Sequence, residues 1–179
     1  MIGNGYIGYG QSDEPLKSLE FYIGRWGLSK EDPMVQKRPQ LADLRVIDFE
    51  WGDGRQLIRS KTGIYGKEQK IPFSEGIITY NPLSEKLVWV EYQFYNKILF
   101  EGEYVPLTDG KVQRVYTVYY AEGYDAIPLP ELEGWTRKFR ETFIPTSDDT
   151  IDWVTEVFIG DKWVKHGQSG GETKAIRIN

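Results

Sequence analysis

From Arg25 onward, apolar and polar residues alternate along the chain with a period of two. The apolar positions are rich in aromatic and β-branched residues, and clusters of Gly, Pro, Asn and Asp interrupt the alternation at short intervals. This combination is typical of β-strands joined by turns. It predicts nine or ten strands, placed at 25–31, 42–51, 55–65, 71–80, 86–95, 97–105, 112–122, 135–144, 151–159 and 163–168, and a last segment at 174–178.

One segment that precedes the strands has the spacing of a helix. Its apolar residues recur at intervals of three and four and share one face, and they are Leu16, Leu19, Tyr22 and Ile23. A helix over 14–23 is therefore expected, ended by a glycine. Because the sequence has no second helical pattern to connect parallel strands, neighbouring strands should pair antiparallel as a meander.

A long meander exposes two sheet edges unless it closes on itself. The sequence thus predicts an all-β fold, an antiparallel up-and-down barrel of about nine or ten strands with a short N-terminal helix closing one end. In such a barrel the long connections 31–41 and 123–134 lie at the end opposite the helix, whereas the helix end has mostly short turns. We expect a cup with the segment 123–134 as a flap over its mouth.

A chain of 179 residues suits one domain, which we expect at 13–179 after a flexible segment at 1–12. Lys and Arg number 22 against 27 Asp and Glu, and the net charge of −5 argues against a nucleic-acid partner. No run approaches the roughly 18 apolar residues of a membrane span, and no targeting segment is visible, so a cytoplasmic protein is expected. A homodimer stays an open alternative.

The composition also excludes several kinds of chemistry. Without cysteine the chain has no thiol nucleophile, disulfide or cysteine-ligated metal. The single histidine, His166, lies between Lys165 and Gly167 near a strand end, a setting more typical of an exposed residue than of a haem ligand. We therefore expect no metal site and no cofactor.

Several motifs resemble a known group of barrels. The segment Phe21–Trp26 resembles the Gly-x-Trp motif that begins the first strand of calycin barrels, the lipocalins and fatty-acid-binding proteins. A Gly-containing fourth strand ending in Tyr80–Asn81 and the turn Asp161–Trp163 resemble uncharacterised bacterial lipocalin-like barrels, over roughly 14–165. The resemblance implies a lipocalin-like barrel of bacterial origin around an apolar small-molecule cavity, which some lineages use for catalysis. It also implies that Trp26 packs over the barrel floor.

The strand 135–144 carries the strongest chemical signal. One of its faces alternates aromatic and charged residues, namely Trp135, Arg137, Phe139, Glu141 and Phe143. Three aromatic residues mark this face as the inward one, so Arg137 and Glu141 should lie inside the barrel. They are about 13 Å apart along the strand, which is too far for direct contact. Each therefore needs a cross-strand partner or a ligand group.

The neighbouring strand 112–122 offers such partners. Its more apolar face carries Arg114, Tyr116, Val118 and Tyr120. Two antiparallel registers are compatible with the pleat. One sets Tyr116 opposite Glu141 and Tyr120 opposite Arg137, and the other sets Arg114 opposite Glu141. Both place a polar cluster within an aromatic wall.

Three interpretations follow for function. In the first, the barrel binds a small hydrophobic or amphipathic molecule that is mostly apolar with one acidic end, held by Arg137. The other expected ligand contacts are Arg114, Tyr120, Tyr92, Tyr80, Phe139, Trp135 and Trp153, of which Tyr92 is assigned to an inward face with Val88, Val90 and Phe94.

In the second interpretation the barrel is a cofactor-free enzyme, an isomerase, cyclase, hydratase or decarboxylase. Glu141 would then be the general acid or base, Tyr116 its proton partner and Arg137 the anchor for an oxyanion. In the third, the inward charges form an internal salt bridge that only satisfies itself, inside a barrel packed throughout.

Overall fold

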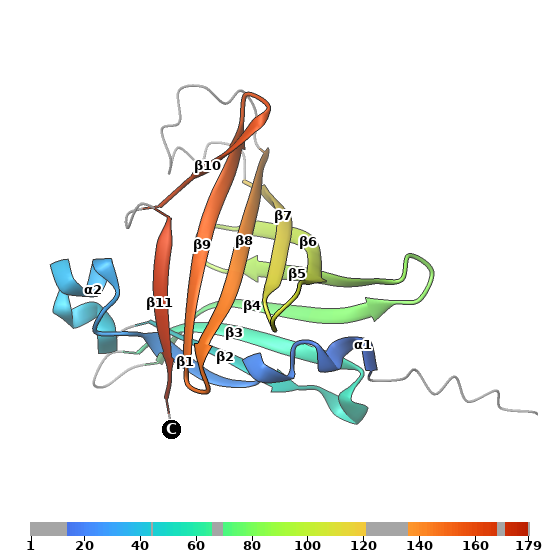
Figure 1. Ribbon diagram of the computed structural model, residues 1–179, viewed down its shortest axis with the longest axis horizontal. Coiled ribbons are helices and arrows are strands. Elements are labelled where there is room, and N and C mark those ends of the chain that lie inside the picture. Colours follow the sequence, from blue (N-terminus) through green and yellow to red (C-terminus); the bar gives the residue numbers. More distant parts are fainter. Residues whose placement is uncertain (1–13, 44, 66–69, 121–135, 168–170, 179) are drawn as a thin grey trace, which may run out of the picture.

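The computed structural model describes residues 14–43, 45–65, 70–120, 136–167 and 171–178 (Figure 1). This part of the chain contains eleven strands, and all their pairings are antiparallel. The strands are β1 (Gly24–Leu28), β2 (Arg45–Trp51), β3 (Leu57–Tyr65), β4 (Lys70–Asn81), β5 (Lys86–Gln93), β6 (Ile98–Pro106), β7 (Val112–Tyr119), β8 (Thr136–Ser147), β9 (Thr150–Ile159), β10 (Lys162–Lys165) and β11 (Glu172–Arg177).

The sheet closes into a barrel. Each strand from β1 to β9 pairs with the next in sequence, β9 also pairs with β11, and β11 pairs with β1. The short strand β10 pairs with the end of β9 that β11 leaves uncovered. Closure satisfies the backbone groups that a flat meander would leave at its edges. The predicted antiparallel lipocalin-like barrel is confirmed, with ten strands in the closed ring.

The helical segments differ from the expectation in two ways. The helix expected over 14–23 is a single turn, α1 (Glu14–Lys17), followed by a 3₁₀ turn, η1 (Glu20–Tyr22). A second helix, α2 (Pro33–Lys37), lies in the connection between β1 and β2 and was not predicted. Two further 3₁₀ turns are η2 (Pro39–Asp43) and η3 (Asp53–Arg55).

The residues before α2 contained a signal for it. Asp32 caps the helix, because its Oδ1 accepts hydrogen bonds from the backbone N–H groups of Met34 (2.8 Å) and Val35 (3.4 Å), and proline occupies the first turn. The other carboxylate oxygen of Asp32 accepts from the backbone N–H of Lys174 at 2.9 Å. This buried aspartate therefore ties the β1–β2 connection to the last strand.

The N-terminal helical segment forms the floor of the barrel. Leu16 and Leu19 are buried in the core, and the gap that Leu19 shares with Ile58 and Ile78 has a volume of only about 10 Å³. The hydroxyl of Tyr22 donates to the carbonyl of Gly110 in the β6–β7 turn at 3.5 Å. Short turns lie at this end, and the long β1–β2 connection leaves from the other (Figure 1). The predicted cup is confirmed in this respect.

Two expectations fall outside the described residues. They are the flexible segment 1–12 and the flap at 123–134. The flanking strand ends, Tyr119 and Thr136, lie at the end opposite α1.

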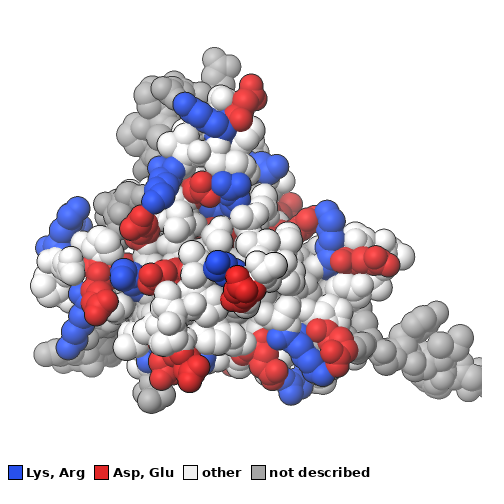
Figure 2. Space-filling view, in the orientation of Figure 1, with Lys and Arg blue, Asp and Glu red and all other residues white. Residues whose placement is uncertain are grey.

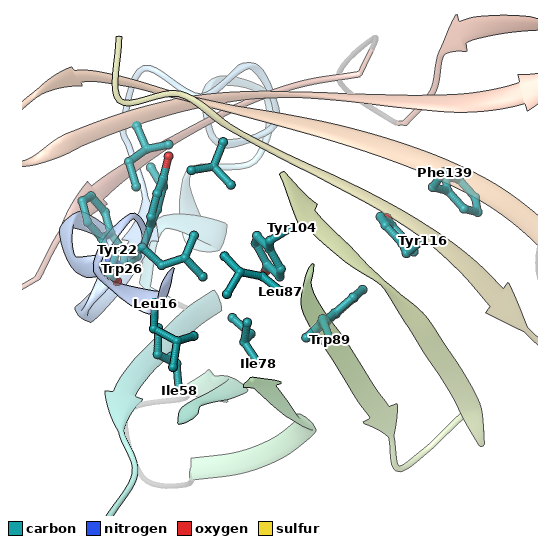
Figure 3. Packing of buried hydrophobic residues seen from close by; sticks show 14 of the residues in the cluster. Leu16, Tyr22, Trp26, Ile58, Ile78, Leu87, Trp89, Tyr104, Tyr116 and Phe139 are labelled. Carbon is teal, nitrogen blue, oxygen red and sulfur yellow. The ribbon is translucent and has the colours of Figure 1, made fainter. Parts of the chain in front are cut away.

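Trp26 on β1 packs against the floor of the barrel, as the resemblance implied, and also contacts β11. Its side chain is 3% exposed, and its Nε1 donates to the carbonyl of Tyr22 at 2.8 Å (Figure 3). The guanidinium of Arg177 lies 4.4 Å from the ring centroid and donates to the carbonyls of Phe21 and Ile23. A single cation–π and hydrogen-bond cluster thus connects η1, β1 and β11.

The outer surface mixes charges of both signs. On the face in Figure 2, Lys and Arg side chains alternate with Asp and Glu, and neither sign forms an extended patch. Ion pairs on the outside of the barrel include Arg25–Asp48 and Lys86–Glu103. No described helix has the length and apolar character needed to cross a membrane.

The floor should depend on the buried leucines of the helical segment. We expect Leu16→Ala to lower the free energy of unfolding by about 2–5 kcal/mol, because it leaves a cavity between α1 and the barrel. Leu83→Ala, at a position 96% exposed in the β4–β5 turn, should change it by less than about 0.5 kcal/mol. Urea unfolding measures both, and equal effects would show that α1 does not seal this end.

Candidate functional site

The barrel interior contains a buried ion pair between β7 and β8. The strand register sets Arg114 directly opposite Glu141 and Tyr116 opposite Phe139. Of the two registers that the sequence allowed, the second is therefore the one formed. Glu141 is only 9% exposed and Phe139 is buried beside it, so the inward face of β8 was predicted correctly.

Most of the polar atoms of this ion pair have hydrogen-bond partners within the protein. Nε and Nη2 of Arg114 both donate to Oε2 of Glu141, the former at 3.1 Å, and Nη1 donates to the hydroxyl of Tyr104 at 3.1 Å. The hydroxyl of Thr155 on β9 donates to the other carboxylate oxygen at 3.3 Å. The guanidinium also lies 4.0 Å from the ring centroid of Trp89. Arg114 is thus held by the protein itself.

This environment keeps the neighbouring tyrosines protonated. Burial raises the pKa of Tyr104 to about 12, although the nearby Arg114 opposes the shift. Burial, and then the charge of Glu141, raise the pKa of Tyr116 well above its usual value. For Arg114, burial disfavours the charged form, but Glu141 together with Tyr104, Tyr116 and Glu91 outweighs burial and raises the pKa. Both phenols are therefore neutral groups beside a charged pair.

A glycine makes room for the aromatic wall around the pair. Gly102 stands between Trp89 and Tyr116 in the cross-strand row, and a Cβ there would lie 2.3 Å from the carbonyl oxygen of Val115. Without a side chain at this point, the rings of Trp89 and Tyr116 meet edge to face at 5.3 Å. Figure 3 shows Tyr116 and Phe139 adjacent, with Trp89 on β5, across the intervening strand β6.

Beside this wall the barrel encloses a cavity of about 390 Å³. Its lining combines aromatic and aliphatic side chains with a few polar and charged ones. The lining residues are Tyr22, Trp26, Met34, Ile47, Phe49, Thr62, Glu91, Arg114, Glu141, Phe143, Ile151, Trp153, Thr155, His166, Gly167, Gly171 and Thr173. A cavity of this size and composition is typical of small-molecule sites.

The assignment of the inward face of β5 was wrong. Val90 and Tyr92 are 47% and 41% exposed, so Tyr92 does not line the cavity. The opposite face points inward and includes Trp89, which is buried, and Glu91, which lines the cavity. Alternation locates both faces of a strand but does not say which is inside when both carry apolar residues. Glu91 was missed for this reason.

Arg137 lies farther along β8 and differs from Arg114 in its contacts. Its Nε and Nη1 are shielded from solvent and have no hydrogen-bond partner in the described part of the chain. The guanidinium lies 5.7 Å from the ring centroid of Tyr120. His166 lines the cavity, and its ring centroid lies 5.6 Å from that of Phe139. Burial, and then the charge of Arg137, lower the pKa of His166. Arg137 itself is not among the lining residues, although its charge acts on His166, which is.

The remaining predicted residues are divided. Trp153 lines the cavity, as expected, and Phe139 is part of the wall. Tyr80 is partly buried against the core, opposite Leu87 near the floor. Trp135 lies outside the described residues. Sequence reasoning also missed Tyr104 and Thr155, the two hydroxyl partners of the ion pair.

Comparison with known proteins adds no assignment: no protein-family model matches the chain, and no curated protein matches it significantly. Within the residues that the structure describes, no group of three or more His, Cys, Asp or Glu side chains could hold a metal ion.

The Arg114–Glu141 pair should be strongly coupled. We expect Glu141→Leu to lower the free energy of unfolding by about 3–5 kcal/mol, because it leaves a buried guanidinium without its counterion. Combining it with Arg114→Met should restore much of the loss, since no charge is then left unpaired. A double-mutant cycle in urea tests this, and strictly additive losses would contradict it.

The pKa of His166 should depend on the charge of Arg137. Burial, and then the charge of Arg137, lower the pKa of His166, so it should titrate below about 6.5. Because the folded state disfavours the protonated imidazole, the associated stability is present above the unfolded-state pKa and is lost as the pH falls toward the folded-state pKa. NMR titration of this single histidine measures the value directly.

Substitution separates the two causes of the lowered pKa of His166, which are burial and the charge of Arg137. Arg137→Gln should raise the pKa of His166 part of the way back, since burial remains, whereas Lys138→Gln on the outer face of β8 should not change it. An unchanged titration in Arg137→Gln would mean that the guanidinium does not act on the imidazole.

Proposed function

We propose that this barrel binds a small, mostly apolar ligand with one acidic end. The ligand body occupies the cavity, and the acidic end is bound by Arg137. The observation that carries this proposal is the guanidinium of Arg137, whose buried Nε and Nη1 find no acceptor among the described residues. Buried donors without acceptors lower stability, and an oxyanion supplies the acceptors that a guanidinium binds best.

The contrast with Arg114 supports Arg137 as the anchor. Arg114 already donates to Glu141 and Tyr104, so an incoming anion would have to compete with a buried carboxylate. Arg137 has no such competitor in the described residues. His166 lines the cavity, and burial and the charge of Arg137 lower its pKa. A ligand that extends past His166 would therefore bring its acidic end to this guanidinium.

The cavity supports binding over a purely structural role. A barrel that served only as a scaffold would be filled by its own side chains, whereas about 390 Å³ of this interior is open. Five aromatic side chains are among the lining residues and give an apolar ligand extensive contact: Tyr22, Trp26, Phe49, Phe143 and Trp153.

The contacts of Glu141 give less support to an enzyme. Both of its oxygens accept hydrogen bonds from Arg114 and Thr155, and the raised pKa of Tyr116 makes this phenol a weak proton donor near neutral pH. The resemblance to uncharacterised bacterial lipocalin-like barrels is part of the binding proposal. A cytoplasmic location and a homodimer stay predictions, which cell fractionation and sedimentation would test.

Ligands that differ only in their head group test the proposal. We expect calorimetry near pH 7 to detect decanoate binding at least about tenfold tighter than 1-decanol, because only the carboxylate can pair with Arg137. Arg137→Gln should weaken decanoate about tenfold or more and change decanol less than about twofold. The matched control, Lys138→Gln, removes a charge from the outer face of the same strand and should change neither affinity.

Two outcomes would overturn the proposal. If neither decanoate nor decanol binds, the cavity does not receive this class of ligand. If decanoate binds equally well to the wild type and to Arg137→Gln, the acidic end is not held by Arg137.

A further inference from the structure

A second charged group faces the same cavity and has no part in the proposed function. Glu91 extends from β5, and its carboxylate accepts hydrogen bonds from the hydroxyls of Ser74 (2.6 Å) and Ser60 (3.2 Å). Each carboxylate oxygen takes one of the two bonds, and both serines are buried. The carboxylate is therefore held in one orientation at the cavity wall.

A glycine makes this arrangement possible. Gly76 on β4 stands between Ser60 on β3 and Glu91 on β5 in the cross-strand row. A Cβ at Gly76 would lie 2.6 Å from the Ser60 hydroxyl and 2.9 Å from Cβ of Glu91. The missing side chain lets a serine reach the carboxylate across the intervening strand. The local packing is thus built around this carboxylate.

Glu91 forms no ion pair with a described residue, although its charge also acts on Arg114. Arg114 lines the same cavity, but its guanidinium is engaged by Glu141 and Tyr104. The serine hydroxyls stabilise the carboxylate as dipoles and add no positive charge. The described cavity wall has two carboxylates, Glu91 and Glu141, for one guanidinium, Arg114, and an enclosed excess of negative charge is unfavourable.

We propose that Glu91 is a cation subsite of the cavity that binds the protonated amine of a ligand with an apolar body. A carboxylate accepts about four hydrogen bonds, so the two serines leave lone pairs for ammonium N–H donors. The aromatic rings that line the cavity also favour a cation over a neutral head group. This inference rests on the proposed function in one respect, namely that the cavity receives a small ligand. The two binding groups are different, because the amine would lie at Glu91 and the acidic end at Arg137.

Decylamine and 1-decanol test the subsite, because they share one chain and differ in charge near pH 7. We expect calorimetry on the wild type to show decylamine binding at least about tenfold tighter than decanol. Glu91→Gln should reduce this preference to within about twofold, since it keeps the shape of the side chain and removes the charge. The matched control is Glu101→Gln, an exposed glutamate on the adjacent strand β6, which should leave the preference intact.

The outcomes separate this inference from the proposed function. Equal affinities of decylamine and decanol for the wild type would overturn the amine subsite and leave ligand binding in place, whereas failure of decanoate, decanol and decylamine alike would reject both. A Glu91→Gln variant with a lowered melting temperature and an unchanged amine preference would show that Glu91 is only structural. If this variant does not fold, Glu91→Asp withdraws the carboxylate by one methylene and should still cut the preference severalfold. A preference unchanged in Glu91→Asp would also overturn the subsite.

Discussion

The interior of this barrel is organised by the need to compensate buried charge. Arg114 and Glu141 meet across β7 and β8, and the contacts of the pair extend to Tyr104 on β6 and Thr155 on β9. Four consecutive strands are thus joined inside the barrel by one polar cluster, and the ring of Trp89 on β5 covers its guanidinium. Because this pair satisfies itself, it contributes to the architecture and leaves little capacity for a ligand.

Two further charged side chains in the described interior, Arg137 and Glu91, lie outside this pair. Arg137 and Glu91 have opposite signs and lie on different strands, and neither forms an ion pair with a described residue. They are also held differently, since two serine hydroxyls fix Glu91 while Nε and Nη1 of Arg137 lack acceptors. A cavity with an excess carboxylate in its wall, and with a guanidinium lacking acceptors close to its residue His166, is better suited to a polar-ended ligand than to a pure hydrocarbon.

Glycines inside the strands decide where the interior is filled and where it stays open. Gly102 allows Trp89 and Tyr116 to pack against each other, and Gly76 allows Ser60 to reach Glu91. A side chain at either position would collide with a neighbouring strand or side chain. The aromatic wall and the cavity beside it therefore both depend on places where a strand contributes no side chain.

The sequence alone determined the barrel, the presence of a helical segment at its floor and the inward face of β8, because alternation, turn residues and helical spacing are local properties of the chain. It did not determine the inward face of β5, whose outward side is the more apolar one, nor which of two registers joins Arg114 to Glu141. Those choices depend on residues that are distant in sequence: Glu91 turns inward where Ser60 and Ser74 meet it from two other strands, and Arg114 and Glu141 are 27 positions apart. Only the closed sheet brings such groups together, since the free energy of a buried charge is set by its spatial neighbours rather than by its neighbours in the chain.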